Sequence, residues 1–479
     1  MEFSYKQLIG GEWRDASSGG TATVINPATE DVVREVPYGA AADCHDAIEA
    51  ARRAFSGWAG RTPYDRGAIL KRTADLIRAE ADRLARTTVL ESGKPLAQAR
   101  GEWLVAADLF EWFAEEGKRA YGRIVPSRVG TRRLNVLKQP IGVVGIIAAW
   151  NFPAYNIARA SAAALAAGCT VVVRPSEYTP LTAMEMMNLL VEAGTPAGVA
   201  NLVVGEADPI GQEMLRHPGC AKIHLTGSVA VGKRLMDGAS KTMTRLSLEL
   251  GGNAPVLVFP DVNLEAVAQG AIAAKFRNGG QVCIAPQRFL VAREVADAFV
   301  DRVADVVGRL RVGSGLDPDT DVGPLINQKQ LERVEGLVES ARSAGASVCV
   351  GGMRPANRTR GYFYQPTVVA DVHPSMPVYE EEIFGPVMPI VSFDDVDEAV
   401  ALANGTRYGL AAYVWTNDLH TAMRASERLE FGMIGVNEWS PQAVEAPFVG
   451  WKESGLGREA GPEGLEEYME TKLVAFGGL

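Results

Sequence analysis

The sequence predicts an α/β protein built from parallel, doubly wound sheets with helices on both faces. Residues 141–149 form a continuous apolar run, which is typical of a strand buried on both faces of a parallel sheet. Short β-branched runs then alternate with amphipathic stretches as far as residue 258, as in strand–helix–strand units. The chain has 479 residues, more than one hydrophobic core usually supports, so we expect two or three domains.

The first predicted domain begins with short strands and turns in residues 1–37. Helical periodicity predicts three helices before the buried strand and four after it, at 43–58, 63–92, 95–118, 154–167, 181–193, 209–216 and 229–238. Further strands are predicted at 170–173, 201–204, 221–225, 245–250 and 254–258. Gly168 directly follows the Ala-rich helix and is a suitable C-terminal stop.

A second α/β region begins near residue 251. Asp261 is predicted to cap a long helix over 262–277, which ends in Asn278-Gly279-Gly280. The elements predicted after it are helices at 295–309 and 328–344 and strands at 347–350, 366–370 and 388–391.

Two segments, 120–140 and 460–479, fit neither region. Within them, 132–138 and 471–475 alternate like strands and are expected to pair with each other or with another subunit. We therefore expect one domain from 1–119 and 141–250, a second from 251–459, and a separate pair of oligomerisation segments.

The composition excludes several classes of function. The formal net charge is −10 and no dense Lys/Arg run occurs, which argues against nucleic-acid and anionic-membrane partners. The N-terminus lacks an apolar signal core and residues 141–150 are too short to span a bilayer, so a cytoplasmic protein is expected. Five scattered cysteines without a CxxC pair indicate a reducing compartment, and the five histidines show no metal-ligand spacing.

Cys283 and Glu249 carry the strongest chemical signal. Cys283 ends the run FRNGGQVC, and Glu249 lies in LELGGN. A thiol can attack a carbonyl and hold it covalently, and a carboxylate can then activate water to release an acid. Taken singly, such a Cys is usually a small buried hydrophobe and such a Glu a solvated charge.

Two other motifs lie at predicted strand ends. Asn151, in AWNFP, could donate a side-chain N–H to an oxyanion or could cap the following helix. Arg174-Pro175-Ser176-Glu177 ends the strand 170–173, where doubly wound folds bind ligands. Glu177 could accept hydrogen bonds from ribose hydroxyls and would repel a 2′-phosphate, or the segment could be an ordinary capped turn.

The segment 227–234, GSVAVGKR, nearly matches a phosphate-binding P-loop. Its last position is Arg234, which has no hydroxyl for magnesium, so a nucleotide hydrolase is only a remote alternative. A helix N-terminus there could still hold a phosphate through its free N–H groups, or the segment could be a plain Gly-rich turn.

Together these motifs resemble the aldehyde dehydrogenase superfamily. The motifs WNFP, RPSE, LTGS, SLELGGNAP, GQVC, EEIFGP and SGLGRE occur in that family's order and spacing over essentially the whole chain, and the sequence is most similar to the succinate-semialdehyde dehydrogenase branch. The resemblance implies an NAD-binding domain, a catalytic domain and a small β oligomerisation flap. It also implies NAD(P)-dependent oxidation of an aldehyde to an acid by a homodimer or homotetramer that needs no metal.

The resemblance assigns roles to individual residues. Cys283 would be the nucleophile, Glu249 the general base, and Asn151 part of the oxyanion hole. The residues matching cofactor contacts are Trp150, Arg174, Ser176, Glu177, Gly227, Ser228, Leu250, Glu382 and Phe384. NAD is the expected cofactor because of Glu177, and NADP is possible because Arg174 replaces the family's usual Lys.

The substrate is expected to be a semialdehyde such as succinate semialdehyde. Arg159 and Arg277 match the arginines that grip a distal carboxylate in that branch, although Arg159 could be a surface charge and Arg277 a helix C-terminal cation. Gln442 stands where the branch often has Ser, and Ala160 where a Lys is common. An aromatic or apolar aldehyde is the alternative, which the aromatic residues Trp439, Phe448 and Trp451 would suit.

Overall fold

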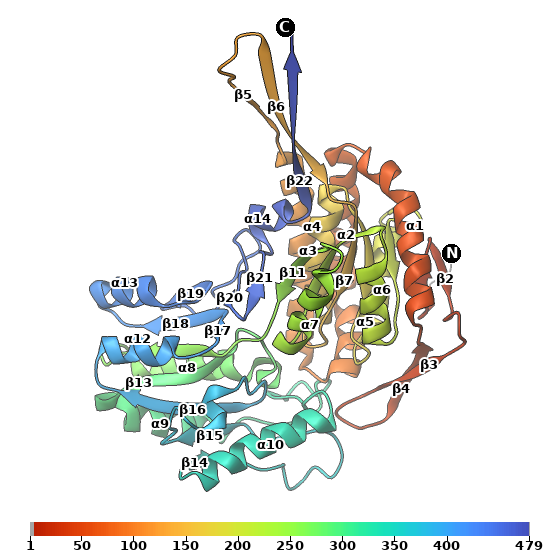
Figure 1. Ribbon diagram of the computed structural model, residues 1–479. Helices are drawn as coiled ribbons and strands as arrows, with labels where there is room; N and C mark the ends of the chain where they lie inside the picture. Colours follow the sequence, from red (N-terminus) through yellow and green to blue (C-terminus); the bar gives the residue numbers. More distant parts are fainter. Residues whose placement is uncertain (1–3, 479) are drawn as a thin grey trace.

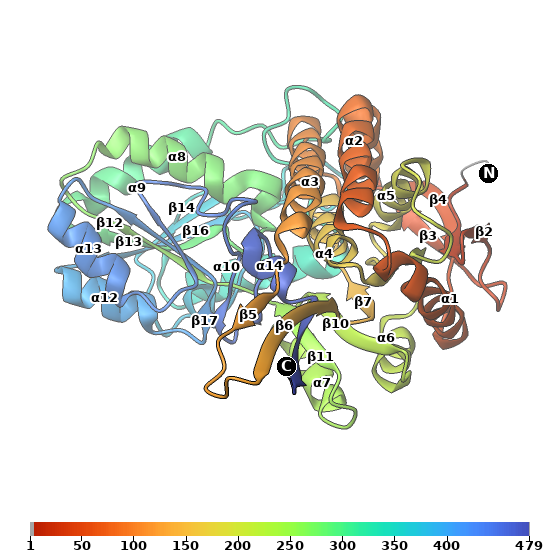
Figure 2. The same ribbon diagram turned by 90° about the horizontal axis from the view of Figure 1, so that it is seen from above.

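Two α/β units lie side by side, and a β flap projects from the seam between them (Figures 1 and 2). The computed structural model describes residues 4–478. The predicted α/β architecture is confirmed. None of the helices within the described residues is long and apolar enough to cross a membrane.

The first unit is an eight-stranded sheet whose central five strands are parallel. Its strands, in order across the sheet, are β2 (Glu12–Arg14), β1 (Gln7–Ile9), β9 (Ala200–Leu202), β8 (Thr170–Arg174), β7 (Val143–Ile147), β10 (Cys220–Thr226), β11 (Arg245–Glu249) and β21 (Gly455–Leu456). The chain winds outward from β7 through β8 to β9, then returns to β10 on its other side. Parallel sheets bind ligands at such a switch point, here between the carboxyl ends of β7 and β10.

Helices cover both faces of this sheet. They are α1 (Ala41–Ala59), α2 (Pro63–Ser92), α3 (Leu96–Glu116), α4 (Pro153–Ala167), α5 (Pro180–Glu192), α6 (Ala207–Arg216) and α7 (Val229–Ala239). Apolar residues of α1, α6 and α7 pack on one face, while α4 and α5 pack on the other beneath α2 and α3. Gly168 ends α4 with φ of 99°, a left-handed conformation that glycine adopts without strain.

The second unit is a seven-stranded sheet, parallel except for one edge strand. Its strands, in order, are β14 (Ser347–Val350), β15 (Thr367–Ala370), β16 (Val387–Phe393), β13 (Pro286–Ala292), β12 (Ala254–Val258), β18 (Ala411–Trp415) and β19 (Met433–Val436). Its helices are α8 (Leu264–Phe276), α9 (Arg293–Val307), α10 (Gln328–Ser343), α11 (Pro377–Glu380), α12 (Val396–Asn404) and α13 (Leu419–Arg428). Apolar residues of α8 and α9 pack on one face and those of α10, α12 and α13 on the other.

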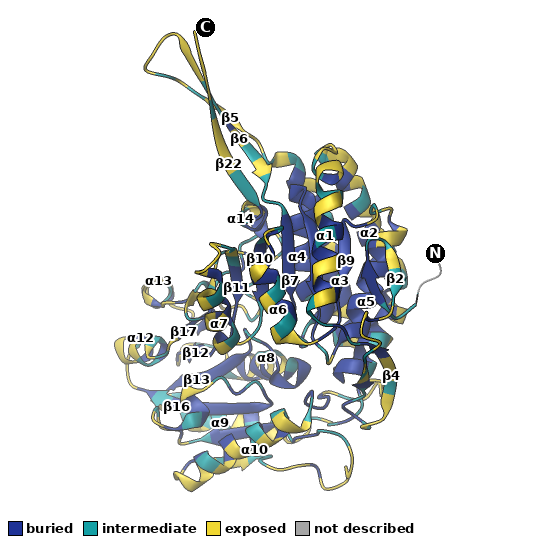
Figure 3. Ribbon diagram, turned by 45° about the vertical axis from the view of Figure 1, so that its right-hand side comes forward, coloured by how far each residue is buried: buried dark blue, intermediate teal, exposed yellow. Residues whose placement is uncertain are grey.

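The segments that fitted neither region pair with each other. Strands β22 (Met469–Gly477), β6 (Arg132–Pro140) and β5 (Arg123–Val125) form a three-stranded antiparallel flap. The flap is exposed along much of its length (Figure 3). The remaining short elements are β3 (Thr21–Ile25), β4 (Val32–Pro37), β17 (Tyr408–Gly409), β20 (Trp451–Lys452), α14 (Gly461–Glu466) and two 3₁₀ turns, Gly117–Arg119 and Arg277–Gly280.

The predicted cap at Asp261 is wrong. Helix α8 begins at Leu264, and the side chain of Asn263 accepts the capping hydrogen bond from the Ala266 N–H. The Asp261 carboxylate instead accepts hydrogen bonds from the loop at 416–418, far along the chain.

One strand crosses the predicted domain boundary. β21 lies within the predicted second domain of 251–459 but pairs with β11 of the first sheet.

Candidate active site

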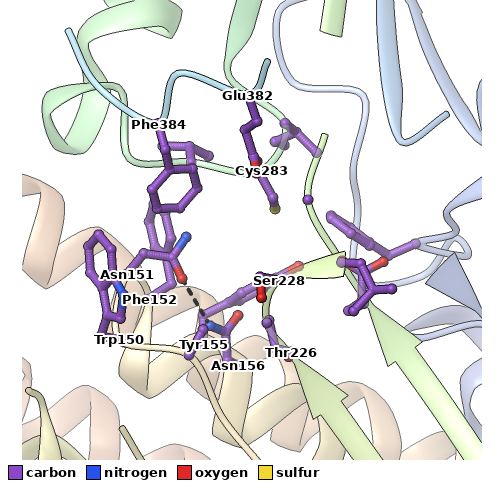
Figure 4. A pocket seen from close by; sticks show the side chains of 18 of the residues that line it. Trp150, Asn151, Phe152, Tyr155, Asn156, Thr226, Ser228, Cys283, Glu382 and Phe384 are labelled. Carbon is purple, nitrogen blue, oxygen red and sulfur yellow. Dashed lines mark hydrogen bonds between the residues drawn. The ribbon is translucent and has the colours of Figure 1, made fainter. Parts of the chain in front are cut away.

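A cavity of about 700 Å³ lies between the two units. The predicted site residues that line it are Trp150, Asn151, Arg159, Gly227, Ser228, Glu249, Leu250, Arg277, Cys283, Glu382, Phe384, Gln442 and Phe448. Figure 4 shows the Cys283 side chain pointing into this space and the Asn151 side chain at its edge. Arg174, Ser176 and Glu177 are not among the lining residues and lie at the carboxyl end of β8.

Cys283 is placed by a tight turn that follows α8. Asn278, Gly279 and Gly280 all have positive φ, of 50°, 63° and 72°. Gly252 packs so closely that a Cβ there would lie 2.3 Å from the carbonyl oxygen of Cys283. The thiol is therefore held by backbone contacts that only glycine permits on that side.

The environment of Cys283 disfavours its charged form. Burial raises the pKa of its thiol to about 12, and nearby Glu249 adds to the shift. A thiol with such a pKa is protonated at neutral pH, so it needs a base to accept its proton when it attacks.

Glu249 ends β11 and is 4% exposed. Burial is the main cause that raises the pKa of its carboxyl well above the ordinary value, while Arg159 opposes the shift. Its Oε2 has no hydrogen-bond partner among the described residues. A carboxyl group with a raised pKa and a free oxygen at a cavity wall is suited to proton transfer near neutral pH.

Asn151 is held from several directions. Its backbone carbonyl accepts hydrogen bonds from Lys94 Nζ (2.7 Å) and Asn278 Nδ2 (2.9 Å), and its own Nδ2 donates to the Gln281 carbonyl at 3.1 Å. The alternative that Asn151 caps helix α4 is wrong. Glu102 of α3 accepts from the N–H groups of Ala154 and Tyr155 instead. The Asn151 Oδ1 accepts from Asn156 Nδ2 at 3.4 Å, so the side chain is fixed at the cavity wall, and its Nδ2 carries a second hydrogen besides the one donated to Gln281.

Lys94 and Glu102 were not anticipated from the sequence. They form a fully buried ion pair of 2.5 Å, and together they contact both the Asn151 carbonyl and the first turn of α4. This pairing could not be predicted, because neither residue lies in one of the motifs that indicated the site.

The arginines differ in their surroundings. Arg159 is 2% exposed, so the alternative of a surface charge is wrong. Its Nη2 lies 2.6 Å from Glu459 Oε2 and 3.8 Å from Glu249 Oε2, while its Nε and Nη1 have no partner among the described residues. Arg277 is half-buried at the C-cap of α8, packs over the Phe152 ring, and makes no ion pair with any residue in 4–478.

Of the three aromatic residues expected near the substrate, only Phe448 lines the cavity. Its ring packs against the Arg159 guanidinium at 4.2 Å. Trp439 packs instead against Trp415 and Tyr413, and Trp451 is 51% exposed on β20. Gln442 lines the cavity, and its buried Oε1 has no hydrogen-bond partner within the described part of the chain.

The other end of the site contains the residues that match cofactor contacts. Gly227 and Ser228 precede α7, whose N-terminal residues line the cavity, and Ser228 Oγ accepts from the Val231 N–H. Glu382 Oε1 accepts from the Gly252 N–H, and burial raises the pKa of Glu382 to about 7. Phe384 meets the Trp150 ring edge-on, with centroids 5.4 Å apart.

The Arg174 side chain makes its hydrogen bonds within the first unit. It donates two hydrogen bonds to the Gly205 carbonyl, and its Nη2 lies 2.9 Å from Glu177 Oε2. Ser176 also contacts Glu177, at 3.5 Å. The Glu177 side chain is 40% exposed and can accept hydrogen bonds from a ligand at this edge of the sheet.

Among the described residues, His45, Glu213 and His217 lie close enough to suggest a metal site on the surface of α1 and α6. However, the Gly219 N–H donates to His217 Nδ1 at 3.0 Å. The neutral ring then carries its proton on Nε2, which faces Glu49 at 3.5 Å and offers no lone pair to a metal.

The chain belongs to the aldehyde dehydrogenase family, whose profile matches residues 13–474. It is 45% identical over 472 residues to the mitochondrial succinate-semialdehyde dehydrogenase of Arabidopsis thaliana, covering 98% of this chain and 89% of that one. It is 44% identical over 475 residues to the succinate-semialdehyde dehydrogenase [NADP(+)] GabD of Escherichia coli (strain K12), covering 99% and 98%.

Solved structures agree with this assignment. The succinate-semialdehyde dehydrogenase from Burkholderia pseudomallei superposes with a TM-score of 0.97 at 45% identity, covering 99% of this chain and 98% of that one. The predicted family resemblance is confirmed, and the protein is an enzyme that oxidises an aldehyde. The remote alternative of a nucleotide hydrolase is not supported, since the family and these relatives are aldehyde dehydrogenases.

Proposed function

We propose that this enzyme oxidises an ω-oxo acid such as succinate semialdehyde to the dicarboxylic acid, with NAD as the preferred cofactor. The observation that carries the substrate class is the pair Arg159 and Arg277 in the wall of the cavity that holds Cys283. Arg277 supplies a positive charge with no ion-pair partner among residues 4–478, and the Nε and Nη1 atoms of Arg159 have no hydrogen-bond partner in the same range. A guanidinium with free N–H groups suits a carboxylate.

The chemistry follows from the residues around Cys283. The sulfur attacks the aldehyde carbon, and Glu249 is the group placed to take the thiol proton. The Asn151 side chain and the Cys283 backbone N–H donate hydrogen bonds to the resulting oxyanion. Removing one such donor costs about 2.7–4 kcal/mol of transition-state stabilisation. When bound, NAD supplies the hydride acceptor for this step.

Removal of hydride from the thiohemiacetal leaves a thioester on Cys283. Glu249 first releases the thiol proton to solvent and then takes a proton from water as the water attacks the thioester carbon. The C–S bond breaks, the acid leaves, and Glu249 returns its proton to the Cys283 thiolate. One aldehyde and one water are consumed, two electrons leave as hydride, and the raised pKa of Glu249 suits both proton transfers.

The residues that would hold the cofactor fit its chemistry. The N-terminal end of α7 offers free N–H groups for a pyrophosphate, and Glu177 and Glu382 offer carboxylates for ribose hydroxyls. Glu177 also faces the position where NADP would add a 2′-phosphate, and like charges repel there. Because Arg174 already contacts Glu177 and Gly205, we expect NADP to be used less well than NAD.

The proposed assembly is a homodimer or homotetramer of a cytoplasmic enzyme. Strand β22 is an open edge of nine residues with Leu473 and Phe476 exposed, a surface typical of an interface. Replacement of both residues by Asp should lower the molar mass measured by light scattering. Five unpaired cysteines fit a reducing compartment.

The test of the substrate class compares succinate semialdehyde with butanal, an uncharged aldehyde of equal carbon number. A charged hydrogen bond of roughly 1.5–3 kcal/mol gives a preference of about tenfold to a hundredfold in kcat/KM. Arg277→Met should remove most of that preference and Arg277→Lys should retain part of it. Equal rates for the two aldehydes in the unaltered enzyme would favour an apolar or aromatic substrate.

A further inference from the structure

A chain of buried polar side chains runs from the cavity to the base of the flap. Arg159 of α4 contacts Glu459, which lies between β21 and α14. The other oxygen of Glu459, Oε1, is 2.8 Å from His224 Nε2 on β10, and His224 Nδ1 is 3.3 Å from the hydroxyl of Tyr468. Tyr468 directly precedes β22 of the flap. Each of these side chains is at most 5% exposed.

His224 lies between a carboxylate and a hydroxyl. Its Nε2 is 2.8 Å from Glu459 Oε1, an ion-pair distance without a hydrogen bond among the described residues. Its Nδ1 is within hydrogen-bond distance of the Tyr468 hydroxyl, which can donate or accept. A proton added to this ring would therefore face the Glu459 carboxylate directly.

The other charged and titratable groups around His224 are already paired. Lys222, on the same strand, lies 2.9 Å from Glu467, which also accepts from Ser247 Oγ. The Cys169 thiol donates to the Tyr468 carbonyl. Glu459 is thus the only carboxylate within ion-pair distance of His224 among the described residues.

Arg159 balances Glu459 when the cavity holds no anion. Burial alone would raise the pKa of Glu459, but the Arg159 guanidinium is the largest opposing cause and the pKa lies below its ordinary value, so Glu459 is charged. A substrate carboxylate on the free N–H groups of Arg159 would share the one positive charge of that guanidinium. Glu459 would then be a buried charge with less compensation, which is costly.

We propose that His224 supplies the missing charge, so that binding of the distal carboxylate at Arg159 is coupled to uptake of a proton by His224. This inference rests on the proposed ω-oxo acid substrate. His224 touches neither the substrate nor the reacting atoms, and it acts on specificity through Glu459 and Arg159. Arg277 makes no ion pair with Glu459, so it does not replace His224 in this role.

The direct test measures proton uptake on ligand binding to the NAD-loaded enzyme. The probe is succinamate, which has the distal carboxylate and a neutral carboxamide at the reacting end. Succinamide, with carboxamides at both ends, is its uncharged control. Calorimetric titrations at pH 7.5 in buffers of different ionisation enthalpy give the number of protons taken up per bound ligand.

The expected result is uptake of a fraction of a proton, up to one, with succinamate and none with succinamide. His224→Gln, which keeps an amide donor but cannot titrate, should abolish the uptake. Zero uptake in the unaltered enzyme, or equal uptake in His224→Gln, would overturn the inference while leaving the substrate class intact. Failure of succinamate to bind, with no preference for succinate semialdehyde over butanal, would remove the substrate class and this inference together.

A kinetic measurement tests the coupling between carboxylate binding and His224 independently. Because carboxylate binding favours protonated His224, the ratio of kcat/KM for succinate semialdehyde over butanal should fall as pH rises through neutrality, by at most about tenfold per pH unit. The ratio should be flat in His224→Gln and should keep a slope in Tyr468→Phe, where the ring still titrates beside Glu459. An unchanged slope in His224→Gln would contradict the coupling. If His224→Gln fails to fold, the slope in Tyr468→Phe decides, since a flat ratio there argues against His224.

Discussion

The guanidinium of Arg159 lies 2.6 Å from the carboxylate of Glu459, and both side chains are almost fully buried. Breaking a buried pair by removing one partner costs about 3–5 kcal/mol, because the other charge is left uncompensated. Loss of activity in an Arg159 variant would therefore mix substrate binding with stability. Arg277, which has no ion-pair partner among the residues that the structure describes, is the residue at which the substrate site can be tested without this loss of stability.

Replacement of the proposed nucleophile should stop the reaction without emptying the cofactor site. In Cys283→Ala we expect no NADH formation above background and unchanged NAD affinity by titration calorimetry. Cys349→Ala, at an exposed position on β14, is the matched control and should be fully active. Substantial turnover in Cys283→Ala would exclude a thiohemiacetal on this residue.

Glu249→Gln should separate the two halves of the reaction. The amide cannot take a proton from water, so the acyl group should remain on Cys283. We expect one rapid burst of NADH per site followed by very slow turnover, and intact-mass spectrometry should show the acyl adduct. Undiminished steady-state turnover would mean that another group activates water.

The thiol of Cys283 should react slowly with alkylating agents in the cofactor-free enzyme. Burial and Glu249 raise its pKa to about 12, so the thiolate fraction grows steadily from pH 7 to 10. Peptide-resolved mass spectrometry of iodoacetamide labelling should show a rate that is still rising at pH 10. A plateau between pH 7 and 9 would reveal an activated thiolate instead.

Glu177→Ala should shift cofactor choice toward NADP. The substitution removes the carboxylate that repels a 2′-phosphate and frees Arg174, which lies 2.9 Å from it. We expect the ratio of kcat/KM for NADP over NAD to rise about tenfold or more, equivalent to roughly 1.4 kcal/mol. Glu177→Gln, which also lacks the charge but keeps a hydrogen-bonding oxygen, should raise the ratio with less loss of NAD use. An unchanged ratio would place the 2′-position elsewhere.

Lys275 on α8 is fully buried, and its Nζ has no partner among the described residues. Burial lowers its pKa to about 7 from an ordinary value of 10.5. Between these values the unfolded chain binds more protons than the folded one, so this group makes stability rise with pH, and below about pH 7 the full cost of burying the charge remains.

Lys275→Met should therefore raise the melting temperature at pH 6 and pH 7, with a gain that shrinks toward pH 10. Differential scanning fluorimetry across this range is the measurement. Lys329→Met, at an exposed position on α10, should change little at any pH. A Lys275→Met gain that is equal at pH 6 and pH 10 would show that packing, not ionisation, is responsible.

Local sequence patterns predicted most of the first unit. The apolar run at 141–149 contains β7, and Gly168 ends α4 as expected. The error at Asp261 has a physical cause. Its carboxylate serves the loop at 416–418, a partner that only the folded chain brings near, so Asn263 is left to cap α8.

The site residues also divide into those that local sequence could predict and those that depend on distant partners. Cys283, Asn151 and Glu249 could be predicted because each lies in a short motif that can be recognised from the sequence. Glu459, His224 and Lys94 could not, because each matters through a partner that is distant in sequence. Trp439 and Trp451, which would suit an aromatic aldehyde, do not line the cavity for a related reason, since the first packs into an aromatic cluster and the second is exposed on strand β20.

The glycines behind the nucleophile also bear on how this enzyme can change. A Cβ at Gly280 would lie 2.2 Å from the Gly385 carbonyl, and one at Gly252 would lie 2.3 Å from the Cys283 carbonyl. Libraries that randomise these positions should return almost only the parental codon. Variants with new substrate ranges should instead carry substitutions at Gln442 and Phe448, where side chains rather than main chain form the cavity wall. These positions can also change during natural divergence without displacing the backbone.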